Sequence, residues 1–247
     1  MQPTASEIND AKQYLRRRLN AEMSMEHRLE ALLMQAAREI VAFAYERNIP
    51  PTLFSFQYDT ILSYEVDRII AHLRQQIEEY DILMATSTDK AERSDLLPYI
   101  YRDIDGYTYS DRLTLYTDRF KQELQLFIAA GLVAGFTKEQ TISEIARGYK
   151  QPYKGTIIAD KPHPNGFTSF TRLLTLTRHT IAEAWMHADM EQAIRGGATG
   201  FISRRGSTYP CQLCDDMANR FHTFAEPYPP YHPNCCCYAI PVYSKME

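Results

Sequence analysis

The sequence predicts a mainly α-helical protein: a helical body followed by a small C-terminal β-rich module, stapled by cysteine and histidine in the manner of a zinc knuckle. Apolar residues recur at helical spacing through most of the chain. From Thr199 the pattern changes to the short β-branched or aromatic segments TGFISRR, RFHTF and CYAIPVY, which are strand signals. All five cysteines lie between Cys211 and Cys237. The predicted division is a body of residues 1–198, with N-terminal helices in 1–109 and core helices in 110–198, and a module of residues 199–247.

Two helices are predicted in the first fifty residues. Thr4 and Glu7 have the spacing of a capping box, which predicts a polar helix to about Leu19. Ser24 is expected to cap a second helix that runs to about Arg47, where the sequence Ile-Pro-Pro stops it. The apolar stripe of this second helix consists of Leu29, Leu32, Leu33, Ala36, Ile40 and Phe43.

A third helix is predicted over about Gln57–Met84, because its apolar residues keep the helical spacing. Residues 85–109 have the composition of a loop. Ser110 is expected to cap a strong helix that weakens at the glycines of GLVAG.

A short helix and a long loop are predicted next. Thr137 and Gln140 form a second candidate capping box, and the helix is expected to end at Arg147 with Gly148 as the residue after its cap. The loop Tyr149–Gly166 contains three prolines and an Ile-Ile pair. We expect it to lie as a β-like arm against the strands of the module, or to become ordered on a partner.

A long helix is predicted over about Thr168–Arg195 and ends at Gly196-Gly197. It carries His179, Glu183 and His187 at four-residue intervals, so these side chains share one face. The spacing differs from the H-E-x-x-H zinc motif. We therefore interpret this face as an ordinary polar surface with Glu–His pairs.

The cysteine-rich module has the ligand spacing of a metal site. Cys211 and Cys214 form C-x2-C, and His232 and Cys235 form H-x2-C after seventeen intervening residues. Tetrahedral zinc binds two such close pairs, each on a tight turn. A metal would also offset the small core of the module. The sequence favours zinc, and the candidate ligands are Cys211, Cys214, His232, Cys235 and Cys237.

The candidate ligands outnumber the four positions of a zinc ion. In an extended segment Cys235 and Cys237 project to one side and Cys236 to the other, so Cys236 is the least suitable ligand. The fourth position is open between Cys235 and Cys237, His232 is either a ligand or only a hydrogen-bond partner, and His222 is a weaker candidate. Disulfides between the two ligand pairs, and unligated thiols, are the alternatives. The odd cysteine count and the absence of cysteine before Cys211 favour metal over disulfides.

Composition and charge limit the classes of function. The formal net charge is −4, so general attraction to nucleic acid or to an anionic membrane is not expected. We interpret the basic clusters Arg16–Arg18 and Arg204-Arg205 as a solvated helix face and a turn. The longest apolar run, Leu126–Phe136, is far shorter than the roughly 20 residues of a spanning helix. No signal peptide is recognisable, which predicts a cytoplasmic protein.

One part of the chain resembles a known family. The C-terminal region of the phage Mu F-like head morphogenesis proteins, which are minor capsid proteins of tailed phages, is similar to Leu176–Val242. The family pattern is a helix bearing Arg-Thr-Glu, a turn, a strand, C-x2-C, a hairpin with Phe, H-P-x-C-R-C and a final strand. Arg178 matches the helix arginine, Glu183 stands one turn beyond the replaced glutamate, and Cys236 replaces an arginine. The direct matches in the module are Cys211, Cys214, His232, Pro233, Cys235 and Cys237.

The resemblance implies a role rather than a reaction. With an upstream helix-turn-helix it covers roughly Leu113–Val242 and implies a non-enzymatic phage or prophage protein that acts in head assembly, DNA packaging or ejection near the portal. The implied partners are portal and capsid proteins, with weak contact to DNA left open and with no membrane and no small-molecule substrate. The implied location is the host cytoplasm during assembly and then the virion interior.

An enzymatic alternative stands beside this interpretation. His232-Pro233-Asn234 is compatible with a zinc-dependent, HNH-like nuclease or another enzyme that processes nucleic acid through the module. An Asp-His pair at a hairpin and an acidic metal cluster, which such an enzyme needs, are missing from the sequence pattern. The sequence therefore predicts a protein that is not an enzyme, with a metal-dependent hydrolase as the alternative.

Overall fold

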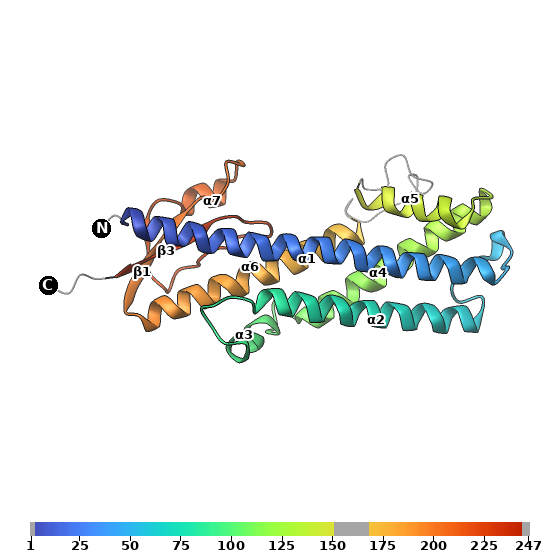
Figure 1. Ribbon diagram of the computed structural model, residues 1–247, viewed down its shortest axis with the longest axis horizontal. Coiled ribbons are helices and arrows are strands. Elements are labelled where there is room, and N and C mark those ends of the chain that lie inside the picture. Colours follow the sequence, from blue (N-terminus) through green and yellow to red (C-terminus); the bar gives the residue numbers. More distant parts are fainter. Residues whose placement is uncertain (1–2, 151–167, 244–247) are drawn as a thin grey trace. The chain divides into compact units, whose positions relative to one another are not determined.

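A computed structural model describes residues 3–150 and 168–243. As predicted, the described residues are mainly helical and end in a small antiparallel sheet (Figure 1). The helices are α1 (Ala5–Glu46), the short 3-10 helix η1 (Pro51–Leu53), α2 (Thr60–Ala85), α3 (Arg93–Ile100), α4 (Tyr109–Val133), α5 (Lys138–Lys150), α6 (Ser169–Arg195) and α7 (Gln212–Met217). The strands are β1 (Ala198–Arg204), β2 (Phe221–His222) and β3 (Tyr238–Tyr243).

Helix α1 is continuous where two helices were predicted. The capping box is confirmed, because the Thr4 N–H donates to Glu7 Oε2 at 2.6 Å and the Glu7 N–H donates to Thr4 Oγ1 at 3.3 Å. The prediction that Ser24 caps a second helix is wrong. Ser24 is exposed inside α1, and the buried stripe continues past it through Met25 and Leu29. Without a glycine or proline nearby, an exposed serine does not end a helix whose opposite face is buried.

Helix α3 lies in the stretch that was predicted as a loop. Its eight residues contain Pro98, and this proline hides the helical pattern in the sequence. Leu96 and Ile100 are buried one turn apart and anchor the helix. Tertiary packing therefore decides a segment whose local propensity is poor.

The start of α4 is set by Thr108 and not by Ser110. The hydroxyl of Thr108 accepts from the Asp111 N–H, and the Asp111 carboxylate accepts from the Thr108 N–H, which completes a capping box. Ser110 lies inside the first turn and donates to Glu78 at 3.2 Å. The prediction placed the cap two residues late because both residues are good caps.

Helix α5 begins as predicted and ends later. The Gln140 N–H donates to Thr137 Oγ1 at 3.3 Å, which confirms the cap. The helix continues through Gly148 to Lys150, so Gly148 is not the residue after the cap. A Cβ on Gly148 would lie 2.6 Å from Cζ of Phe127, so this glycine permits a close approach between α5 and α4. The remainder of the predicted loop Tyr149–Gly166 lies outside the described residues, and the expectation of a β-like arm stays a prediction.

Gly148→Ala is expected to lower the free energy of unfolding by about 1–2 kcal/mol, because the added methyl group overpacks the buried Phe127 ring. Helix propensity alone would raise stability by up to about 1 kcal/mol. Urea denaturation followed by circular dichroism measures the change. The loss should shrink in a Phe127→Leu background, where the neighbouring side chain is smaller. A Gly148→Ala protein at least as stable as wild type would contradict the packing argument.

The chain divides into two compact units. The sheet unit contains the strands and consists of Met1–Glu26, Asp81–Ile104 and Thr175–Glu247. The helical unit consists of His27–Tyr80 and Asp105–Leu174. The compact units therefore do not divide at residue 198, because the β-rich module belongs with the N-terminal part of α1 and the C-terminal part of α6 (Figure 1).

The sheet has β1 in the centre and both neighbours antiparallel, in the order β2-β1-β3. Ile202 pairs with Ile240 on one side, and Phe201 pairs with His222 on the other. The sheet packs against α1 and α6 in one core cluster. Its buried members are Ala11, Leu15, Met186, Met190, Phe201, Tyr238, Ala239 and Ile240.

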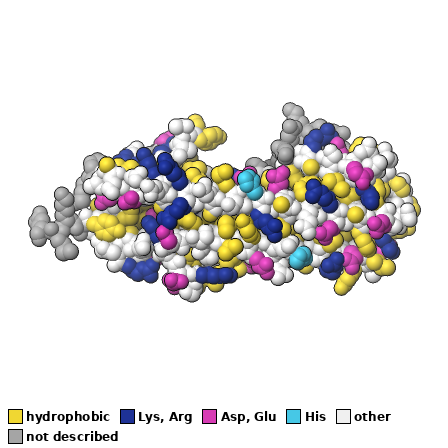
Figure 2. All heavy atoms as spheres, in the orientation of Figure 1, with side chains coloured by type: hydrophobic (Ala, Val, Ile, Leu, Met, Phe, Trp, Pro, Cys, Tyr) yellow, Lys and Arg dark blue, Asp and Glu magenta, His cyan; other side chains and the backbone are white. Residues whose placement is uncertain are grey.

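The described surface is mixed in charge. Basic and acidic side chains are interspersed over the face drawn in Figure 2. Among the described residues, no helix combines the length and the apolar character that crossing a membrane requires.

Candidate metal centre

The two predicted ligand pairs each lie on a tight turn. Cys211 flanks the N-terminus of α7, and Cys214 lies in its first turn. The second pair lies on a turn in which the Cys235 N–H donates to the His232 carbonyl at 3.1 Å. Cys211, Cys214 and His232 lie together, and Cys214 also lies beside Cys235.

The distances within this cluster suit a tetrahedral ion. With Zn–S near 2.3 Å and Zn–N near 2.0 Å, ligand sulfurs lie roughly 3.8 Å apart, and a sulfur and a nitrogen lie roughly 3.5 Å apart. The sulfurs of Cys214 and Cys235 are 3.8 Å apart. His232 Nε2 lies 3.3 Å from Cys211 Sγ and 3.1 Å from Cys214 Sγ. These groups could hold a metal ion.

The orientation of His232 also suits a metal ligand. Its Nδ1–H donates to the Pro233 carbonyl at 2.8 Å, which leaves Nε2 facing the sulfurs. A histidine that binds metal through one ring nitrogen usually donates from the other nitrogen to a carbonyl or carboxylate, which fixes its tautomer. The ring is therefore oriented as a metal ligand requires.

Cys214 is shared by two groups of candidate ligands. One group is Cys211, Cys214 and His232, and the other is Cys214, Cys235 and Cys237. The predicted split of the Cys-Cys-Cys segment agrees with burial, because Cys235 and Cys237 are buried and Cys236 is only half-buried and lies outside both groups. All five cysteines are free thiols, without a disulfide.

The thiols of the buried group differ in acidity. Hydrogen bonding from the Cys237 thiol lowers the pKa of Cys235 to about 5, and the same contact raises the pKa of Cys237. Desolvation raises the pKa of Cys214 to about 12. The Cys235 sulfur therefore accepts from the Cys237 thiol. A bound cation would replace the protons of the thiols that bind it.

Arg205 braces the first ligand turn. Its Nη1 lies 3.5 Å from the Cys211 carbonyl, and its guanidinium also contacts the Asp215 carboxylate and the Tyr209 carbonyl. Arg204 contacts the side chain of Asn219. The interpretation of Arg204-Arg205 as merely a solvated turn is therefore wrong for Arg205. The sequence did not reveal this role of Arg205, because no sequence pattern distinguishes an arginine that contacts a ligand turn from one on an exposed turn.

His222 is a structural residue. Its side chain is fully buried and stacks on Phe201 with ring centroids 5.0 Å apart. Nδ1 pairs with Glu226 at 3.0 Å, and Nε2 contacts the Met217 carbonyl at 2.8 Å. Both ring nitrogens are thus used, which removes it from the ligand set.

The polar face of α6 contains one Glu–His pair and one aromatic stack. His179 Nε2 lies 3.5 Å from Glu183, which also binds Arg102 at 3.0 Å. His187 stacks on Tyr99 with ring centroids 4.0 Å apart, and its Nδ1 lies 3.2 Å from the Tyr228 hydroxyl. The expected Glu–His pairing is confirmed for His179, while His187 instead links α6 to α3 and to the module.

His187 should titrate below pH 6.5, because desolvation lowers its pKa from the ordinary value of 6.5. The unfolded chain then binds the proton more tightly, so this group's contribution to stability is complete above pH 6.5 and is lost as the pH falls below it. NMR titration of the histidine rings, with the signal assigned by His187→Asn, measures the midpoint. The stability advantage of wild type over His187→Asn should shrink on acidification. A midpoint above 6.5 would contradict the burial of this ring.

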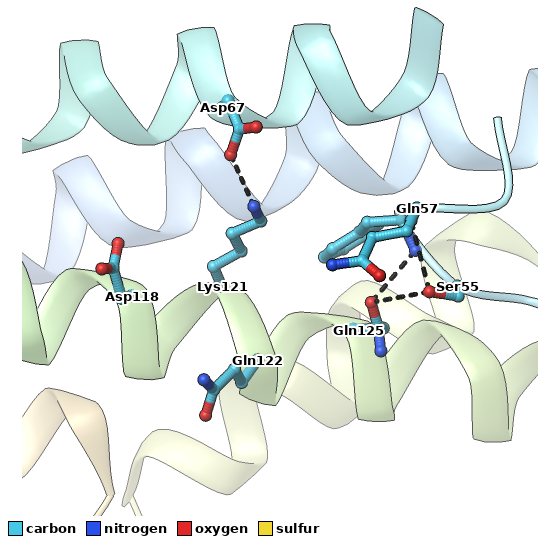
Figure 3. Close-up of a pocket in the computed structure, with 8 residues that line it drawn as sticks. Ser55, Gln57, Asp67, Asp118, Lys121, Gln122 and Gln125 are labelled. Carbon is cyan, nitrogen blue, oxygen red and sulfur yellow. Dashed lines mark hydrogen bonds and ion pairs between the residues drawn. The ribbon is translucent and has the colours of Figure 1, made fainter. Parts of the chain in front are cut away.

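A polar cavity of about 490 Å³ lies in the helical unit (Figure 3). Its charged groups are already paired, Lys121 with Asp67 and Asp118 with Arg74. Gln125 Oε1 accepts from the Phe56 N–H at 3.0 Å. The lining groups therefore stabilise the helices, and we propose no ligand for this cavity.

Comparison of the chain with family models, with curated proteins and with solved structures found no match.

Proposed function

We propose that this chain is a non-enzymatic minor capsid protein of a phage or prophage, acting in head assembly, DNA packaging or ejection near the portal. In this proposal one structural zinc ion staples its C-terminal module. The observation that supports the proposal is the cluster of Cys211, Cys214 and His232, with Cys235 beside Cys214, because these residues also match the Mu F-like pattern. The capsid role is inferred from the sequence resemblance. The zinc ion is inferred from the distances between the cysteine and histidine side chains.

Zinc is the metal that the donor set favours. Thiolates and imidazole at tetrahedral spacing are typical of structural zinc, which needs four protein ligands. Cys211, Cys214 and His232 supply three of them, and we assign Cys235 as the fourth because its sulfur lies 3.8 Å from that of Cys214. Cys237 is the remaining candidate for that position.

The nuclease alternative has less support from the same geometry. A general base needs a ring nitrogen that can reach a substrate or water. Nε2 of His232 faces two thiols, and Nδ1 donates to a backbone carbonyl. Asn234 stands at an exposed turn with a φ of 63°, which explains its presence by conformation rather than chemistry.

Protein partners fit the surface of the module better than nucleic acid does. Four large apolar side chains are exposed on it, Tyr209, Leu213, Phe221 and Tyr243. Exposed aromatic and aliphatic groups are typical of protein interfaces, whereas nucleic-acid surfaces are basic. Portal and capsid proteins are the proposed partners, and the proposed location is the host cytoplasm during assembly and then the virion interior.

Protein purified under reducing conditions is expected to contain about one zinc per chain by elemental analysis. Cys214→Ser should lose the metal, because Cys214 belongs to both ligand groups. Cys236→Ser is the matched control and should keep it, because its thiol lies outside both groups. A metal content near zero, with thiol titration that reveals oxidised pairs, would replace zinc by disulfides.

Co-expression with a portal protein from the same genome should yield a complex, and mass spectrometry of purified particles should detect the chain in few copies. Cys214→Ser tests whether the folded module is needed, with Cys236→Ser as the control. Recovery of the chain with nucleic acid and not with portal, together with metal-dependent cleavage of that nucleic acid, would favour the nuclease alternative instead.

A further inference from the structure

Arg18 is a buried charge on a helix face that should be apolar. It follows Ala11 and Leu15 at the spacing of one α1 face, and both of those residues belong to the core against the sheet. Arg18 is only 1% exposed, while Arg16 and Arg17 are exposed. Burying a guanidinium costs free energy unless its charge and N–H groups are satisfied. Its partners therefore reveal why an arginine stands there.

Those partners are the backbone of the proposed metal centre and one carboxylate. Nη2 donates to the Cys235 carbonyl at 3.2 Å, and Nη1 lies 3.5 Å from the Cys237 carbonyl. Nε lies 3.1 Å from Oε1 of Glu22, one turn further along α1. The rigid fork of a guanidinium suits two carbonyls that face the same way, as those of alternate residues in an extended segment do.

Cys235 is consequently fixed at three of its atoms. Its N–H donates to His232, its carbonyl accepts from Arg18, and its sulfur lies 3.8 Å from that of Cys214. This leaves the side chain little freedom to leave the cluster.

The carbonyl of the intervening Cys236 is covered from the other side. A Cβ on Gly206 would lie 1.9 Å from that oxygen and 3.0 Å from Cδ2 of Leu15, so only glycine permits this approach. The backbone of Cys235–Cys237 is thus held between α1 and the turn at Gly206.

We infer that Arg18 is a positioning residue of the metal centre. It holds the second ligand turn in place through the Cys235 and Cys237 carbonyls. It also places a buried positive charge beside a centre in which three thiolates outweigh the charge of Zn²⁺. This inference rests on the proposed zinc site and extends it to a residue that lies more than two hundred positions away in the sequence.

The test removes the guanidinium of Arg18 together with the carboxylate of Glu22 that pairs with it. Arg18→Met with Glu22→Gln leaves no unpaired buried charge, so the variant isolates the loss of the two carbonyl contacts. Competition with a chromophoric chelator is expected to show zinc affinity reduced about 10–100-fold, as for other residues that support metal ligands. Co²⁺ substitution should show weakened tetrahedral absorption bands. Arg18→Lys should fall between wild type and this variant, because an ammonium group cannot reproduce the planar fork.

The matched control is Arg17→Met with Asp89→Asn, which removes an exposed ion pair one position away on α1. Exposed pairs contribute little, so zinc affinity should change by less than about twofold. Thermal unfolding with zinc and with a chelator gives a second measure. The stabilisation that zinc confers should shrink in the Arg18 variant and persist in the control.

The outcomes distinguish a failure of the inference about Arg18 from a failure of the proposed zinc site. Wild-type zinc affinity and an unchanged cobalt spectrum in the Arg18 variant would overturn the inference, as would equal destabilisation with and without metal. If the double variant does not fold, the Arg18→Lys protein provides the test. Wild-type zinc affinity in that protein would show that the guanidinium of Arg18 is not required. If wild-type protein binds neither zinc nor cobalt, the proposed metal site itself fails, whatever Arg18 does.

Discussion

The Cys235–Cys237 segment is the constraint on which the sheet unit depends. The side chains of Cys235 and Cys237 contribute to the candidate metal cluster, their carbonyls are contacted by Arg18, and β3 begins at the next residue, Tyr238. β3 pairs with β1, which follows α6 directly after the Gly196-Gly197 turn. A displacement of these three residues would therefore affect the ligand cluster, the register of the sheet and its packing on α1 together. The cysteines are thus part of the same unit as the helices that cover the sheet.

Local signals predicted most of the secondary structure, because they act within one turn of chain. The capping boxes at Thr4 and Thr137 and the Gly-Gly stop after α6 are formed by neighbouring residues. The sequence analysis went wrong where distant packing decides. Gly148 resembles a helix stop, but its missing Cβ serves the contact with Phe127. Likewise α3 forms despite its proline because Leu96 and Ile100 find a buried surface.

The candidate metal site was predictable in its ligands and not in its support. Close cysteine pairs are visible as spacing, because each pair must fit one tight turn. Arg18 and Arg205 contact that site from the far end of the chain and from the preceding turn, and no spacing links them to it. One clue was present: Arg18 continues the spacing of Ala11 and Leu15, which lie on the core face of α1, while the turn of about 100° at each residue points Arg16 and Arg17 away from that face.

The four described histidines of the sheet unit make contacts within the protein. His222 and His232 each have both ring nitrogens directed at protein groups. His179 pairs with Glu183, and His187 is stacked on Tyr99. A catalytic histidine needs a nitrogen that can exchange a proton with a substrate or water. His187 instead links α6 to α3 and to the module, and His222 stacks on Phe201 of the neighbouring strand, so these two rings hold separate segments of the sheet unit together.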